Sequence, residues 1–391
     1  MGGAVSSAGS GFNRQFYVRT KVIRFGAGAS ALPLESLQDY LQQLDHDTSL
    51  RPISSASELQ LDDHCKTKVG GFRLTLPAYR QAAQILAPGL SKFLPDIAGM
   101  TRSDDNRDQL IDGIMAIQLW NRLMDLRFGL FERYRVIRNE KERTIEGFVS
   151  YKHQYMENIW LYNESVESLR QGNRQINMHA ASLAGRRLAL WFKDTTPAFS
   201  ITSDNRTWPF YCGCYFTNGE ATGMSVRGTS AILTPWGVCL APYKRFGRRV
   251  THIGRDFVER VGEMFASVVY AEIPLDKLRT GAAELLTKSL GFQIDWNADQ
   301  RKERAKKITH SLGLLGIQKN LAVEVTDLAL ATGRYQGVNT TEWSQAHQLY
   351  AGRTVLDLFV PLLWTARRLD QIRREKMEQA AFEVLMGRLL L

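Results

Sequence analysis

The first 143 residues carry mainly helical periodicity. Apolar side chains recur three and four positions apart in 32–44, 79–94 and 110–126, and the last run follows an N-cap signal at Ser103. Ahead of them, 12–26 interleaves β-prone apolar residues with Arg and Lys, a pattern typical of an edge strand or arm with a basic outer face. We expect residues 1–143 to form an N-terminal, mainly helical region with a leading β arm.

Short strand-like segments replace this pattern between residues 144 and 254. Turn-forming residues such as Asn218 and Gly219 separate them, and one helix is expected at 156–169. The strand-like segments are 144–151, 180–183, 188–192, 199–202, 208–216 and 224–233. Short strands with such turns predict an antiparallel, β-rich core over 144–254.

Helical spacing returns at Arg255 and continues to the end of the chain. The predicted helices are 255–270, 274–290, 299–312, 321–330 and one long segment, 354–390. Residues 255–391 are therefore expected to be a helical C-terminal region. The fold class predicted for the whole chain is α+β, with a central antiparallel sheet, an N-terminal helical segment and a helical C-terminal region.

Composition narrows the classes of protein to which the chain can belong. It has 391 residues, 44% of them hydrophobic, and no apolar run approaches the roughly 20 residues that span a bilayer. We therefore expect no membrane partner. Four cysteines without a charged-then-apolar leader indicate a reducing, cytoplasmic setting. The net charge of +10 favours a polyanionic partner, with solubility alone as the alternative explanation.

The basic residues cluster most densely in 241–260, which contains six Lys or Arg and two acidic residues. Flexible backbone, guanidinium groups and exposed rings together are typical of single-stranded nucleic-acid binding, so we predict such a site in a Gly-containing loop here. The alternative is a solvated loop between sheet and helix. The candidate residues are Arg227, Tyr243, Lys244, Arg245, Phe246, Arg248, Arg249, His252 and Arg255.

Two further basic runs, 301–307 and 367–376, fall on predicted helices. Charge runs on helices are usually exposed faces, and we interpret both in that way. They would extend the nucleic-acid footprint only if they shared a side of the molecule with the 241–260 cluster.

Sequence motifs for catalysis are weak. Cys212, Cys214, Cys239 and His252 are possible zinc ligands, but one Cys-x-Cys lacks the paired spacing of structural zinc sites. The glycine-rich stretches do not end in the Lys-Ser/Thr of a phosphate loop. We therefore expect no metal, no cofactor and no catalytic residue.

Two blocks in the middle of the chain resemble a phage- and plasmid-borne family of unknown function. They are Gly147-Phe148-Val149-Ser150-Tyr151-Lys152-His153-Gln154-Tyr155-Met156-Glu157-Asn158 and Ala181-Ser182-Leu183-Ala184-Gly185-Arg186-Arg187-Leu188-Ala189-Leu190-Trp191. The similarity continues in Thr217-Asn218-Gly219-Glu220-Ala221-Thr222-Gly223-Met224-Ser225, Gly237-Val238-Cys239-Leu240 and His252-Ile253-Gly254. It covers about 145–350. The family's cysteine is usually followed by Asn, where this chain has Leu240, so no role is carried over to that turn.

The resemblance implies an origin in a mobile element or virus and, from that setting, DNA transactions. With the basic cluster, it predicts a sequence-tolerant nucleic-acid-binding protein that binds or anneals single strands within a homo-oligomer. One alternative is a viral structural or assembly protein, whose long C-terminal helix and exposed strands make subunit contacts. Another is a metal-dependent nuclease that uses Glu220, His252 and Asp256.

Overall fold

The computed structural model confirms an α+β fold with a central antiparallel sheet. It describes residues 22–23, 31–32, 36–88, 114–172, 175–184, 186–203, 206–219, 225–289, 298–330, 354–369 and 371–389. Of the predicted basic strand or arm at 12–26, only Val22–Ile23 falls within these residues, as β1, which pairs with β2 (Ala31–Leu32).

The central sheet is built around two long neighbouring strands, β10 (Arg206–Gly219) and β11 (Ser225–Thr234). Its order is β12-β11-β10-β8-β7, with every pair antiparallel. Strand β9 pairs with the first half of β10, and β13 pairs with the first half of β11. The remaining bounds are β7 (Ile176–Ala184), β8 (Arg187–Asp194), β9 (Phe199–Ser203), β12 (Gly237–Leu240) and β13 (Gly247–Thr251).

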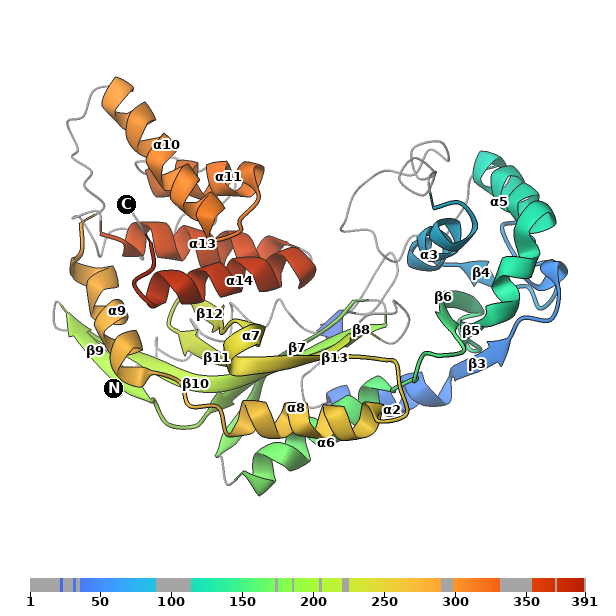
Figure 1. The fold of residues 1–391 in the computed structure, drawn as a ribbon, viewed down its shortest axis with the longest axis horizontal. Coiled ribbons are helices and arrows are strands. Elements are labelled where there is room, and N and C mark those ends of the chain that lie inside the picture. The colour runs from blue at the N-terminus through green and yellow to red at the C-terminus, as the bar shows by residue number, and fades with distance from the viewer. Residues whose placement is uncertain are drawn as a thin grey trace, which may run out of the picture.

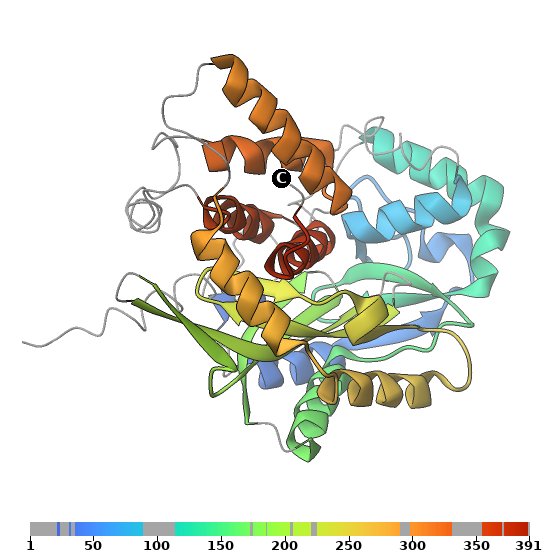
Figure 2. The same ribbon diagram turned by 60° about the vertical axis from the view of Figure 1, so that its left-hand side comes forward.

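Helices cover both faces of this sheet (Figures 1 and 2). Because strand side chains alternate between the faces, Phe216 and Val226 point to one face, where they pack with Phe265 of α8. The helices on this face are α2 (Leu37–His46), α6 (Asn158–Gln171) and α8 (Phe257–Val269). Trp191 and Tyr215 point to the opposite face, where α14 lies.

The C-terminal region forms a layer of its own over β12. Its helices are α9 (Leu275–Thr287), α10 (Ala298–Leu314), α11 (Lys319–Leu330), α13 (Leu356–Arg368) and α14 (Gln371–Leu385). The single long segment predicted for 354–390 is wrong, because the backbone turns extended at Leu369 and α14 folds back on α13. This turn lets both helices bury apolar side chains such as Leu362 and Phe382 in one core.

A smaller lobe precedes the main body and holds a second sheet, in the order β3-β5-β6-β4. Its elements are β3 (Thr48–Pro52), η2 (Ala56–Glu58), β4 (Arg73–Leu74), α3 (Leu76–Leu86), α5 (Ile114–Arg127), η3 (Phe128–Arg133), β5 (Tyr134–Asn139) and β6 (Thr144–Ser150). The structure differs here from the predicted division, since β5 and β6 pair across the expected boundary at residue 143. Trp120, whose indole donates to the carbonyl of Leu59 at 2.5 Å, lies in the lobe's core.

Buried polar contacts join this lobe to the main body. The Arg186 guanidinium donates to the carboxylate of Glu146 on β6. The imidazoles of His153 and His252 stack with their centroids 4.5 Å apart. Arg186 and both histidines are buried, so these contacts fix the position at which the chain leaves the small sheet for the large one.

Among the helices in the described ranges, none is both long and apolar enough to cross a membrane.

Candidate nucleic-acid interface

The basic cluster folds into regular structure. Residues Tyr243–Phe246 form one helical turn, α7, and Gly247–Thr251 form β13. The prediction of a loop is therefore wrong over 243–251. Gly247 explains the tight connection, because a Cβ there would collide with the backbone of Gly228 and Thr229 on β11. The backbone that presents the charges is consequently held in the sheet.

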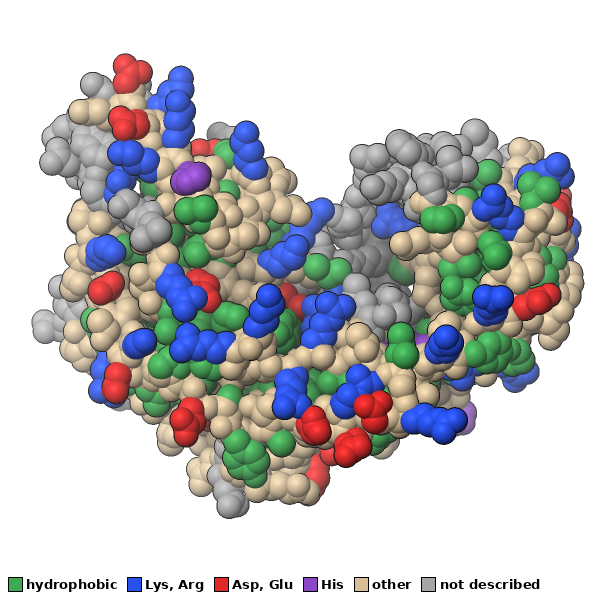
Figure 3. All heavy atoms as spheres, viewed as in Figure 1, with side chains coloured by type: hydrophobic (Ala, Val, Ile, Leu, Met, Phe, Trp, Pro, Cys, Tyr) green, Lys and Arg blue, Asp and Glu red, His purple; other side chains and the backbone are tan. Residues whose placement is uncertain are grey.

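Five cationic side chains of this segment are exposed: Lys244, Arg245, Arg248, Arg249 and Arg255. We call them the basic surface. Figure 3 shows Lys and Arg side chains gathered over α7 and β13, near the hollow between the main body and the small lobe. The structure thus exposes five of the nine predicted residues along one segment.

Strand alternation divides the two arginines of β13 between the faces of the sheet. Arg248 points toward α8 and pairs with Glu263 at 2.5 Å, and both side chains are more than half exposed. Arg249 points to the other face, and its Nε donates to Ser225 Oγ at 2.7 Å. Arg248–Glu263 is the one ion pair between the basic surface and an acid among the described residues. A surface pair of this kind contributes little to stability and can exchange for a phosphate.

The two predicted stacking rings face inward. Phe246 is 6% exposed and packs against Phe382 of α14, with 5.7 Å between ring centroids. The hydroxyl of Tyr243 donates to Glu375 at 3.3 Å. The prediction of exposed rings at both positions is therefore wrong. The cause is that α7 packs between the sheet and α14, which draws its aromatic residues into the core.

His252 is buried and does not reach the basic surface. Its ring lies between His153 and Phe257, with centroids 4.5 and 4.9 Å away. Its Nδ1 lies 2.8 Å from the backbone carbonyl of Gln154, which can only accept a hydrogen bond. Burial lowers the pKa of this imidazole, so its role is to join the lobes as a neutral ring rather than to contact phosphate.

Arg227 is used inside the protein. Its Nη1 donates at 2.8 Å to the carboxylate of Glu375 on α14, and Arg187 of β8 donates to the same carboxylate at 2.7 Å. The hydroxyls of Tyr215 and Tyr243 donate to it as well. Burial, reinforced by the Glu375 charge, raises the pKa of Tyr243. We call these five residues the Glu375 cluster.

A second set of polar groups, buried or partly buried, lies next to this cluster. Arg374 pairs with Glu378 at 2.7 Å and stacks over Trp191, 4.5 Å from the ring centroid. Burial, with the charges of Lys193 and Arg374, lowers the pKa of His179 on β7 to about 3. Of the 367–376 run, at least Arg374 is thus buried and not part of an exposed face. In the 301–307 run, Lys302, Lys306 and Lys307 are exposed, as predicted.

One exposed aromatic residue was not identified from the sequence. Tyr151 follows β6 and is 52% exposed, with the Arg135 guanidinium 5.8 Å from the centroid of its ring. The antiparallel bridge between His153 and Ile253 places this segment beside the one that carries Arg255. Nothing in the local sequence indicates that a single Tyr at the end of a strand is exposed or lies near the basic surface. Only the pairing of the two segments brings it to the basic surface.

Two alternative chemistries, a zinc site and a metal-dependent nuclease, need grouped metal-binding side chains. No three His, Cys, Asp or Glu side chains within the described ranges are grouped to hold a metal ion, and Cys212, Cys214, Cys239 and His252 all lie in those ranges. Of the proposed nuclease residues, Glu220 lies outside the described residues and Asp256 pairs with Arg260 at 3.0 Å.

Comparison with protein-family models, with curated proteins and with solved structures finds no match to this chain. The resemblance to the phage- and plasmid-borne family therefore stays a prediction.

Removing the central carboxylate should destabilise the fold. In Glu375→Ala, the buried guanidinium of Arg187 and the partly buried one of Arg227 lose their counter-charge, and we expect the free energy of unfolding to fall by about 3 kcal/mol or more. Urea unfolding followed by circular dichroism measures the change. Glu303→Ala removes an exposed partner of Lys307 and should change stability by less than about 0.5 kcal/mol. Equal losses in the two variants would contradict the role of Glu375.

His179 should make stability depend on pH. The folded state keeps the imidazole neutral down to about pH 3, whereas an unfolded imidazole takes up a proton below about pH 6.5. Stability from this group is therefore complete above pH 6.5 and declines as the pH falls toward 3. Between pH 7 and pH 5 the native protein should lose about 2 kcal/mol more than His179→Gln. Parallel pH profiles in urea unfolding would contradict this assignment.

Proposed function

We propose that the protein binds single-stranded nucleic acid without sequence preference, through the basic surface. The observation that carries the proposal is the exposure of five cations within twelve residues of one continuous segment, only one of them paired with an acid among the described residues. Cations that do not already hold a carboxylate can neutralise phosphates and release condensed counterions. The net charge of +10 supports the same partner.

The geometry favours backbone contacts over base readout. The cations follow one another along α7, a strand and the turn after it, with Arg248 and Arg249 on opposite faces of the strand. This is an extended track along one segment and not a helix shaped for a groove. Phosphate contacts position a strand but carry no sequence information. Tyr151, beside the Arg255 end of the track, supplies an exposed ring on which any base can stack.

This activity fits annealing or protection of single strands, as a mobile element or virus requires, within a homo-oligomer. A protein that must cover strands of any sequence needs backbone and stacking contacts, which are the contacts that the basic surface and Tyr151 offer.

The salt dependence of binding tests the proposal. We expect Lys244→Ala, Arg245→Ala and Arg249→Ala together to weaken binding of a labelled single strand and to lower the salt slope by about 2, at roughly 0.7 for each phosphate that is no longer neutralised. Fluorescence anisotropy across a salt series measures both quantities, with DNA and RNA oligonucleotides of mixed sequence.

A matched variant removes the same charge elsewhere. Lys302→Ala, Lys306→Ala and Lys307→Ala take three exposed cations from α10 and should leave the slope unchanged. If both triple variants lower the slope equally, net charge alone drives binding and the basic surface is not the site. No binding by the native protein at low salt would end the proposal.

Tyr151 tests the stacking contact separately. Tyr151→Ala should cost about 1–3 kcal/mol of binding free energy with no change in salt slope, because it removes a ring and no charge. Tyr151→Phe keeps the ring and should bind like the native protein. Equal weakening by Phe and Ala would show that the hydroxyl, and not stacking, matters.

A further inference from the structure

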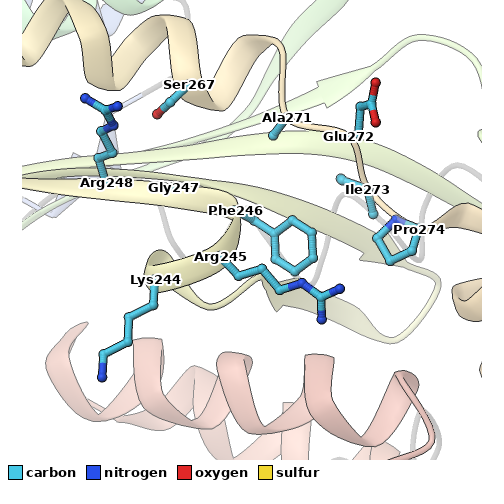
Figure 4. A pocket seen from close by; sticks show the side chains of 10 residues that line it. All are labelled: Lys244, Arg245, Phe246, Gly247, Arg248, Ser267, Ala271, Glu272, Ile273 and Pro274. Atoms are coloured by element: carbon cyan, nitrogen blue, oxygen red, sulfur yellow. The ribbon is translucent and has the colours of Figure 1, made fainter.

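A pocket of about 620 Å³ opens at the α7 end of the basic surface. It lies between α7, the start of β13, the end of α8 and the segment that leads from α8 into α9 (Figure 4). Small-molecule sites typically occupy about 300–1,000 Å³, so this volume is large enough for a ligand of one or two rings. Phosphate contacts along the exposed track do not by themselves account for this space.

The lining combines positive charge with an apolar wall. Lys244, Arg245 and Arg248 contribute three cations against one acid, Glu272, whose carboxylate points away from Arg245 in Figure 4. The rest is mainly apolar and comes from the ring of Phe246 together with Ala271, Ile273 and Pro274. A bare anion would not contact the apolar wall favourably, and an uncharged apolar ligand would not interact with the cations.

The walls of the pocket are held in place by packing within the protein. Phe246 is fixed by its contact with Phe382, and Gly247 allows β13 to lie close against β11. Pro274 restricts the backbone on the opposite side. Binding therefore needs little ordering of these walls, which favours affinity for a small ligand.

We infer that this pocket binds one nucleotide, with the base against Phe246, Ile273 and Pro274 and the phosphate at Arg245, which lies beside the Phe246 ring (Figure 4). The inference rests on the proposed function and deepens it, because the pocket would hold one nucleotide of a strand that follows the basic surface. Flat apolar rings joined to a phosphate match both halves of the lining. The contacts available to the base are apolar, so base identity should matter little.

Isothermal titration with adenosine 5′-monophosphate, adenosine and inorganic phosphate tests the inference. We expect the nucleotide to bind with a Kd near about 0.1 mM, and each fragment to bind at least about tenfold more weakly. Inorganic phosphate binding as tightly as the nucleotide would overturn the role of the apolar wall. No binding of the nucleotide would overturn the inference altogether.

Two variants locate the binding. Ala271→Trp fills the pocket without changing its charge and should abolish nucleotide binding, whereas Val323→Trp at an exposed position of α11 should not. If Ala271→Trp does not fold, Arg245→Ala replaces it: this side chain is exposed, and its removal should weaken nucleotide binding at least about tenfold. Nucleotide affinity that survives in the variant tested overturns the assignment.

The same samples separate this inference from the proposed function. Ala271→Trp retains every cation, so an oligonucleotide should keep the native salt slope while its affinity falls. A native protein that binds oligonucleotides through the basic surface but binds no mononucleotide would disprove only the pocket. The reverse result, mononucleotide binding without salt-dependent binding of strands, would disprove the extended surface and leave the pocket.

Discussion

The position of the basic surface depends on the carboxylate of Glu375. It accepts hydrogen bonds from Arg187 and Arg227, which stand on two strands of the central sheet, and from the hydroxyls of Tyr215 and Tyr243. A buried guanidinium and a partly buried one without a counter-charge would be costly, so α14 must lie on this face of the sheet. Through Tyr243, the same carboxylate holds α7, and α7 leads directly into β13. The position of the exposed cations thus follows from a charge pairing in the interior.

Two neighbouring arginines, Arg227 and Arg249, have different uses in this arrangement. Arg227 and Arg249 are direct partners in the β11–β13 pairing, and both side chains hydrogen-bond Ser225. Arg227 also reaches the carboxylate on α14 and is committed to the fold, whereas Arg249 has no acidic partner among the described residues and is exposed. Two arginines that are paired across neighbouring strands therefore differ in use: Arg227 stabilises the fold, whereas the Arg249 guanidinium is exposed to solvent.

The sequence predicted the antiparallel sheet, because the long apolar runs of β10 and β11 with their turn residues are strong local signals. It also located the basic cluster. It did not separate Arg227 from Arg249, since the partner of Arg227 lies 148 positions away along the chain. Phe246 was misassigned for a similar reason: its neighbour Phe382 belongs to the last helix, and an aromatic residue among arginines looks exposed when only local sequence is considered. The break at Leu369 depends on burial by both α13 and α14, which no local pattern encodes.

The charges on β13 have another physical explanation that must be compared with ligand binding. Among the described strands β13 pairs only with β11, and cations on an edge strand prevent pairing with other chains. That role explains Arg248 and Arg249. It does not explain Lys244 and Arg245, which precede the strand, or Arg255, which follows it, and it gives no purpose to the pocket beside α7. Protection of the edge and the proposed binding of phosphate are compatible, and the proposed binding also accounts for the cations beyond both ends of the strand.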